Sequence, residues 1–172
     1  MPELTPQERL QPALLDRLTD EEPDKKQEPR ERRVMSRTHL RRAVLRDLAW
    51  LFNATRLEAG VDLSGAPHAR RSVINFGLPA FSGKSASAVD VSELERSIRQ
   101  ALTDFEPRIL PETLRVEALL EPSSLDHHNV IGVKISAALW AQPVPLELLL
   151  RTEIDLETGK VEIADLVQSR AV

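Results

Sequence analysis

The chain has no cysteine, and only 3% of its 172 residues are aromatic. Without cysteine, neither disulfide bonds nor catalysis by a thiol is available, and a reducing compartment suits such a chain. The shortage of aromatic side chains means that the core is mainly aliphatic. It also argues against a surface on which bases or sugars stack.

A net positive charge and long apolar runs are also lacking. The formal net charge is −4, which argues against a nucleic-acid partner held by electrostatics. No apolar run approaches the length of a membrane span, and the first five residues lack the basic start and apolar stretch of a secretory signal. We therefore expect a cytoplasmic protein that neither binds nucleic acid nor inserts into a membrane.

The first 37 residues differ in character from the rest. Thr5 and Pro6 form a typical helix start, and an apolar stripe follows on a short helix that ends near Thr19 (Leu10, Leu14, Leu15, Leu18). The stretch 20–37 mixes both charge signs and contains two prolines, so it has little to bury. We expect residues 1–37 to be an N-terminal helix and a charged linker, and residues 38–172 to be one domain.

Two longer helices are expected in this domain. The first covers about 38–55 and has an apolar side (Leu40, Val44, Leu45, Leu48, Leu51, Phe52). The second begins at Ser92, which forms a capping box with Glu95. It ends near Phe105, because Pro107 disfavours the helical conformation for Glu106. The region 60–90 between them is rich in loops, and 72–76 has the pattern of a short strand.

Alternating apolar residues then predict strands at 114–120, 130–139 and 146–155. The strand at 130–139 carries little charge and is expected to be central. Gly159 has the position of a hairpin turn, and a last strand returns from Val161. The sequence therefore predicts an α+β fold, with N-terminal helices and a helix packed on a small, largely antiparallel sheet.

The most informative motif is Glu106-Pro107-Arg108, directly after the second long helix. In an extended segment, residues two apart point to the same side, so Glu106 and Arg108 should lie together. This pair is either an ordinary surface ion pair, worth about 0–1 kcal/mol, or part of a partner-binding site. The spacing alone leaves both readings open.

Other motifs support no chemistry of their own. Gly83-Lys84-Ser85 resembles the end of a phosphate-binding loop, but Leu78 stands where that motif needs glycine. The histidines of 126–128 are adjacent and point to opposite faces if extended, so a solvated loop is expected there and no metal site. Glycoside hydrolysis needs two acids facing each other, and Asp104 lies on a different helical face from Glu106. We expect neither a cofactor nor a metal.

Several segments together resemble a known family. The segments 14–18, 44–51, 72–79, 105–108 and 154–159 match the TssE family of type VI secretion baseplate subunits, in the right order and over nearly the whole chain. This family is grouped with a phage baseplate-wedge subunit that is often labelled "lysozyme-like". Phe76 stands where tyrosine is common in the family, which is a small departure.

The resemblance implies a structural protein, not an enzyme, that joins baseplate wedges to the contractile sheath and starts sheath polymerisation. Its sheet is expected to resemble the sheath domain that interlocks by strand exchange, with Glu147, Glu153 and Asp155 discouraging other strands at the edge. The family's Glu-Pro-Arg signature, here 106–108, is taken to bind the helical core of the wedge. The alternative is a peptidoglycan hydrolase that acts locally on the cell wall.

We expect Glu106 and Arg108 to serve binding and not stability. If both side chains leave the core, truncating either one should change stability by less than about 0.5 kcal/mol. Loss of one partner of a desolvated charge pair at an interface would instead weaken wedge binding more than tenfold.

Overall fold

The computed structural model describes residues 13–19, 24, 35–83, 89–119, 129–141 and 144–167. Its helices are α1 (Leu14–Leu18), α2 (Arg37–Asn53), α3 (Pro67–Arg70) and α4 (Val91–Phe105), with short 3-10 turns η3 (Leu57–Ala59), η4 (Val73–Asn75) and η6 (Pro111–Thr113). Its strands are β1 (Arg115–Leu119), β2 (Val130–Leu139), β3 (Leu146–Asp155) and β4 (Val161–Asp165).

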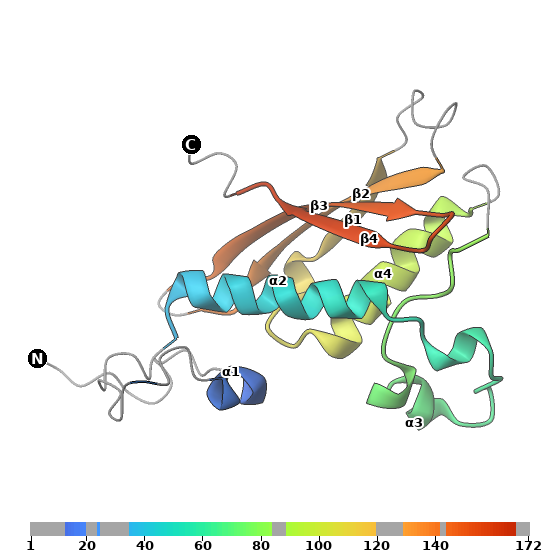
Figure 1. Ribbon diagram of the computed structural model, residues 1–172, viewed down its shortest axis with the longest axis horizontal. Coiled ribbons are helices and arrows are strands. Elements are labelled where there is room, and N and C mark those ends of the chain that lie inside the picture. The colour runs from blue at the N-terminus through green and yellow to red at the C-terminus, as the bar shows by residue number, and fades with distance from the viewer. Residues whose placement is uncertain are drawn as a thin grey trace, which may run out of the picture.

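The strands form one antiparallel sheet in the order β1-β2-β3-β4. Helices α2 and α4 lie along one face of this sheet, so the domain has two layers (Figure 1). Burial alternates residue by residue along β2, whose inward side chains are buried and whose outward side chains are partly exposed. The α+β fold and the central position of the strand at 130–139 are confirmed.

The core is aliphatic, as the shortage of aromatic residues required. Helix α4 contributes four buried side chains (Leu94, Ile98, Ala101, Leu102). Helix α2 contributes six (Leu40, Ala43, Val44, Leu48, Leu51, Phe52). These face the inward residues of the two central strands (Ile131, Val133, Ile135, Ala137, Leu139, Leu148, Leu150, Thr152, Ile154).

The predicted strand at 72–76 is wrong, because this segment forms the 3-10 turn η4. The Ser72 hydroxyl accepts a hydrogen bond from the Ile74 N–H at 3.3 Å. Asn75 is buried; its side-chain amide donates to the Arg70 carbonyl at 2.9 Å, and its side-chain oxygen accepts from the Glu58 N–H at 2.9 Å. These side-chain bonds to nearby backbone give the segment an alternative to a strand ladder.

Gly77 allows two backbone segments to approach closely. The Leu78 N–H donates to the Ala54 carbonyl at 2.8 Å, and the Arg56 N–H donates to the Leu78 carbonyl at 2.9 Å. Gly77 has φ +126°, and a Cβ built on it would lie 2.3 Å from the Ala54 oxygen. Only glycine fits this position without movement of the end of α2.

The start of α4 also differs from the expectation. Asp90 is the N-cap; its Oδ1 accepts from the N–H groups of Ser92 at 2.8 Å and Glu93 at 3.2 Å. The predicted capping box of Ser92 and Glu95 is therefore wrong. Glu95 instead accepts a hydrogen bond from the Ala118 N–H of β1 at 2.8 Å.

The edges of the sheet are protected differently from the expectation. Strands β1 and β4 are the edges, and β4 pairs with residues 150–154 of β3, so Glu153 is not an edge residue. Asp155 lies at the turn into β4, and Glu147 lies on the part of β3 that β4 does not cover. The backbone of β4 is capped by Asn53 of α2, which both donates to the Val161 carbonyl and accepts from its N–H, each at 3.0 Å. With Glu95 on β1, helix side chains occupy backbone groups at both edges.

Several expectations fall outside the described residues. Helix α1 ends at Leu18, next to the expected end, but its predicted start at Thr5 is not described, nor is most of the linker 20–37. The same holds for 126–128 and for all but the first residue of 83–85. Among the described residues, no helix is long and apolar enough to cross a membrane.

Candidate functional site: the Glu-Pro-Arg corner

Residues Glu106, Pro107 and Arg108, hereafter the corner, follow α4 directly. The helix ends at Phe105 as predicted, and the Glu106 N–H closes its last turn on the Leu102 carbonyl at 3.0 Å. Glu106 has φ −121° and ψ 80°, which is not helical, as expected of a residue before proline. The chain thus leaves the helix at a sharp, fixed bend.

Glu106 and Arg108 form a bidentate ion pair. The Arg108 Nε donates to Glu106 Oε1 at 2.6 Å, and its Nη2 donates to Oε2 at 2.5 Å. The Arg108 backbone N–H also donates to Oε1, at 3.1 Å. The sequence placed these two side chains on the same side, and this geometry is confirmed.

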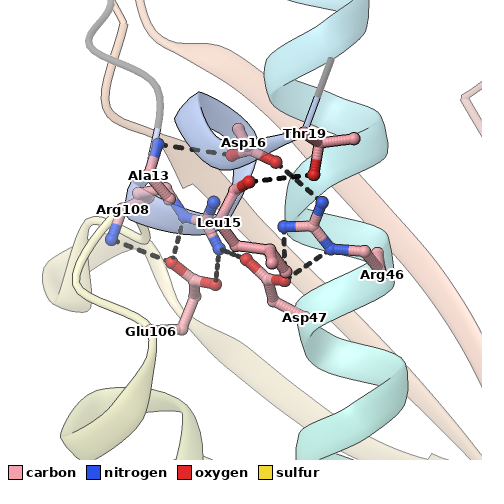
Figure 2. Close-up of polar contacts among 8 residues, drawn as sticks. All are labelled: Ala13, Leu15, Asp16, Thr19, Arg46, Asp47, Glu106 and Arg108. Atoms are coloured by element: carbon pink, nitrogen blue, oxygen red, sulfur yellow. Dashed lines mark hydrogen bonds and ion pairs between the residues drawn. The ribbon is translucent and has the colours of Figure 1, made fainter. Parts of the chain in front are cut away.

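The pair continues into a chain of charges that joins three separate segments (Figure 2). Arg108 Nη2 also donates to Asp47 Oδ2 of α2 at 2.6 Å. Asp47 Oδ1 accepts from Arg46 Nε at 2.9 Å, and Arg46 Nη1 donates to Asp16 Oδ1 of α1 at 2.7 Å. We call these five residues (Asp16, Arg46, Asp47, Glu106, Arg108) the corner network.

The expectation that both corner side chains leave the core is wrong. Glu106 is only 3% exposed, and the Arg108 side chain is 22% exposed. The bend after α4 turns the Glu106 carboxylate toward α2, where Arg108 and Asp47 meet it. A buried carboxylate requires such a partner, because an unpaired buried charge costs several kcal/mol. The corner is therefore an internal brace between α4 and α2, with Arg108 at its exposed end.

The surroundings of the two arginines shift their pKa. Burial lowers the pKa of Arg108, but its hydrogen bonds to Glu106, followed by those to Asp47, outweigh burial and raise it above the ordinary value. Burial also lowers the pKa of Arg46, but the hydrogen bonds to Asp16 and Asp47 outweigh burial, so this pKa is raised as well. Both guanidinium groups are thus charged at neutral pH.

The corner is also tied to the sheet through its backbone. The Trp140 N–H donates to the Arg108 carbonyl at 2.7 Å, and the Leu110 N–H donates to the Ala138 carbonyl at 2.9 Å. This short extension of the end of β2 fixes the direction in which the chain leaves Pro107. The same bend therefore couples α2, α4 and the sheet.

Sequence reasoning did not find the other members of the corner network. Arg46 and Asp47 lie outside the apolar stripe of α2, and nothing in the sequence distinguishes Asp16. The only available signal was a pair of opposite charges on the flank of an apolar stripe. Which charges meet across 30 or 61 positions is a tertiary property.

Asp104, the other acid near the corner, faces elsewhere. It accepts from Arg71 Nε at 3.2 Å and from the Gln100 side chain at 2.7 Å. It lines a groove of about 650 Å³ between α4 and the segment 56–77. The described residues include no group of three or more histidines and acids that could hold a metal.

Comparison with family models places the chain among the components of baseplates. The family model of baseplate wedge protein gp25 matches residues 38–144. No curated protein and no solved structure matches the chain. Since the match covers more than half of the chain, the chain belongs to the baseplate wedge protein gp25 family, of which TssE is the type VI secretion homologue. As a member, it assembles with other baseplate components.

Proposed function

We propose that the protein is the type VI secretion baseplate subunit that joins the wedges to the contractile sheath and starts sheath polymerisation. The observation that carries this proposal is the family match over 38–144, together with the resemblance of segments outside it, at 14–18 and 154–159, to TssE. On this proposal it works at the cytoplasmic face, on a baseplate docked at the membrane, with no catalytic activity of its own.

Strand exchange with sheath subunits would take place at an edge of the sheet. An added strand satisfies unpaired backbone groups, and side-chain pockets set its specificity. At each edge a helix side chain must first give up its hydrogen bond: Glu95 at β1 or Asn53 at β4. Such capping would keep the edges closed until the sheath subunit arrives.

The corner is proposed as part of the wedge-binding site. Pro107 is exposed, and Arg108 is the more accessible of the two charged members, while Glu106 holds the guanidinium in one orientation. A lysine would keep the charge but lose the planar fork that bonds Glu106 and Asp47 together. The corner thus contributes to binding both through Arg108 and through the elements that it holds in place.

The test is co-purification of the tagged full-length protein with co-expressed wedge subunits and sheath subunits. The wild type should capture wedge subunits, and Glu106→Ala, Arg108→Ala and Arg108→Lys should capture at least about tenfold less per folded molecule. Because the corner is an internal brace, the amount of folded protein must be measured for each variant. If melting falls steeply but binding per folded molecule is unchanged, the corner has no part in wedge binding.

A turbidity assay on purified cell wall addresses the hydrolase alternative. Both oxygens of Glu106 accept hydrogen bonds from Arg108, and Asp104 points into a different groove, which supports a structural role. We expect lysis at background for the wild type and for Glu106→Gln. Robust lysis that this substitution abolishes would reject the proposal of a purely structural protein.

A further inference from the structure

The segment 56–77 takes no part in the proposed function. It contains η3, α3 and η4, and Figure 1 shows it projecting beyond the C-terminal end of α2. A groove separates this segment from α4, and no residue of the corner network lines that groove. The segment and the groove therefore form a surface separate from the corner.

Turn η4 presents two apolar side chains on a fixed base. Val73 is 81% exposed and Ile74 is 64% exposed. Asn75, the next residue, is buried, and its side chain bonds the backbone at Arg70 and Glu58. These bonds close the turn without burying its two apolar residues. The pair is thus held at the surface, where a partner can cover it.

The groove beside η4 has a surplus of positive charge. Its volume is about 650 Å³, and Asn75 and Gly77 lie in its wall. Three arginines and two acids also line it (Arg56, Arg70, Arg71, Glu58, Asp104). The groove therefore has one more guanidinium than it has carboxylates, in a chain whose formal net charge is −4.

The contacts within the groove identify the arginine that is left over. Asp104 accepts a hydrogen bond from Arg71, and Glu58 Oε1 lies 2.7 Å from Arg70 Nη2. Arg56 has only the second oxygen of the same carboxylate, with Glu58 Oε2 at 3.8 Å from its Nε. This buried Nε has no hydrogen-bond partner among the described residues. Since an unsatisfied buried donor is destabilising, a further carboxylate would stabilise Arg56, whose side chain is 30% exposed.

We propose that the groove and η4 form a docking surface for an acidic segment of another baseplate subunit. A carboxylate of this segment pairs with Arg56, and an apolar neighbour covers Val73 and Ile74. A carboxylate suits the groove better than a phosphate group, because it brings the one negative charge that is missing, and Glu58 and Asp104 would repel a second. Its two oxygens also match the planar fork of a guanidinium. Neither the corner nor a sheet edge takes part, so this surface goes beyond the proposed function.

The experiment is co-purification of the full-length protein with co-expressed baseplate subunits, compared per folded molecule. Arg56→Gln should capture at least about tenfold less partner protein. Glu58→Gln, which removes the carboxylate that competes for Arg56, should capture more than the wild type. If the pair had only a structural role, both variants would capture less. The matched control is Arg115→Gln, on an exposed arginine of β1, which should bind as the wild type does.

The apolar part of the surface is tested in the same assay. The double variant Val73→Ala/Ile74→Ala should capture at least about fivefold less partner protein. Its melting temperature should be unchanged, because both side chains are exposed. The control Leu14→Ala/Leu18→Ala removes two side chains of similar exposure, 72% and 74%, on α1. This control should bind as the wild type does.

Three outcomes would overturn the inference. The first is wild-type capture by Arg56→Gln or by the Val73/Ile74 double variant. The second is an equal loss of capture in Glu58→Gln and Arg56→Gln. The third is self-association of the wild type in light scattering that Arg56→Gln abolishes, which would make a second copy of this chain the occupant.

The same assay separates this inference from the proposed function. If the corner variants lose binding and the groove variants do not, the docking surface fails but the proposed function stands. If the groove variants lose binding and the corner variants do not, the docking surface stands and the corner has no part in wedge binding. If the wild type captures no baseplate subunit, both fail.

Discussion

Replacing Glu106 by alanine should destabilise the domain by about 3 kcal/mol, because a buried pair would lose one partner. Glu106 accepts three hydrogen bonds from Arg108, at 2.5, 2.6 and 3.1 Å. Removing the carboxylate leaves a largely buried guanidinium with Asp47 as its remaining partner in the described chain. Loss of one partner of a buried pair costs about 3–5 kcal/mol, and the 22% exposure of the Arg108 side chain places this case at the lower end.

The assay is thermal and urea unfolding followed by circular dichroism at neutral pH. For a chain of this size, about 3 kcal/mol corresponds to a fall in Tm of about 6–12 °C. The control is Glu153→Ala, which removes an ion pair to Arg151 in which the two side chains are 53% and 43% exposed. That change should cost no more than about 1 kcal/mol. A Glu106→Ala variant as stable as this control would refute the view that the corner braces α2 against α4.

Three further perturbations test other parts of the structure. Gly77→Ala should lower the free energy of unfolding in urea by about 2–4 kcal/mol, because the new Cβ would clash with the Ala54 oxygen and the residue has a positive φ. The control Gly65→Ala, with nothing within 4 Å of the new Cβ, should leave the stability unchanged. Glu95→Ala should uncover the edge of β1 and increase concentration-dependent association in light scattering; a variant that stays as monodisperse as the wild type would argue against edge protection. The pKa of Asp155 is lowered by a hydrogen bond from the Thr158 hydroxyl and, to a smaller extent, by hydrogen bonds from two backbone N–H groups. The ionised Asp155 carboxylate therefore stabilises the fold above the ordinary carboxyl pKa near 4, and this stabilisation is lost as the pH falls below that value. Asp155→Asn should therefore be less stable than the wild type at pH 7 and equal to it in acid, and a difference that persists in acid would contradict this reasoning.

The sequence by itself determined most of the elements. Periodic apolar residues located α2 and α4, and alternation located β1, β2 and β3, because each element must bury one face. The turn at Gly159 located β4. Pro107 placed the end of α4 at Phe105, since the restriction on the residue before proline is local. The family, too, was readable from short motifs in order along the chain.

Local polar chemistry was harder to read. The stretch 72–76 has the composition of a strand, yet Asn75 finds backbone partners at Arg70 and Glu58 and closes a turn. Ser92 and Glu95 were expected to form a capping box, but Asp90 is the N-cap, and Glu95 bonds to β1 instead. In each case a contact made across the fold selected one of two locally allowed conformations.

Only the tertiary structure decided the nature of the corner. Spacing put Glu106 and Arg108 side by side, but it could not say whether they face solvent or α2. That depends on where Asp47 and Asp16 arrive, and these residues come from segments far away in the chain. Burial of a charge is a property of the packed molecule, since the same side chain is tolerated in the core only where partners from other elements meet it.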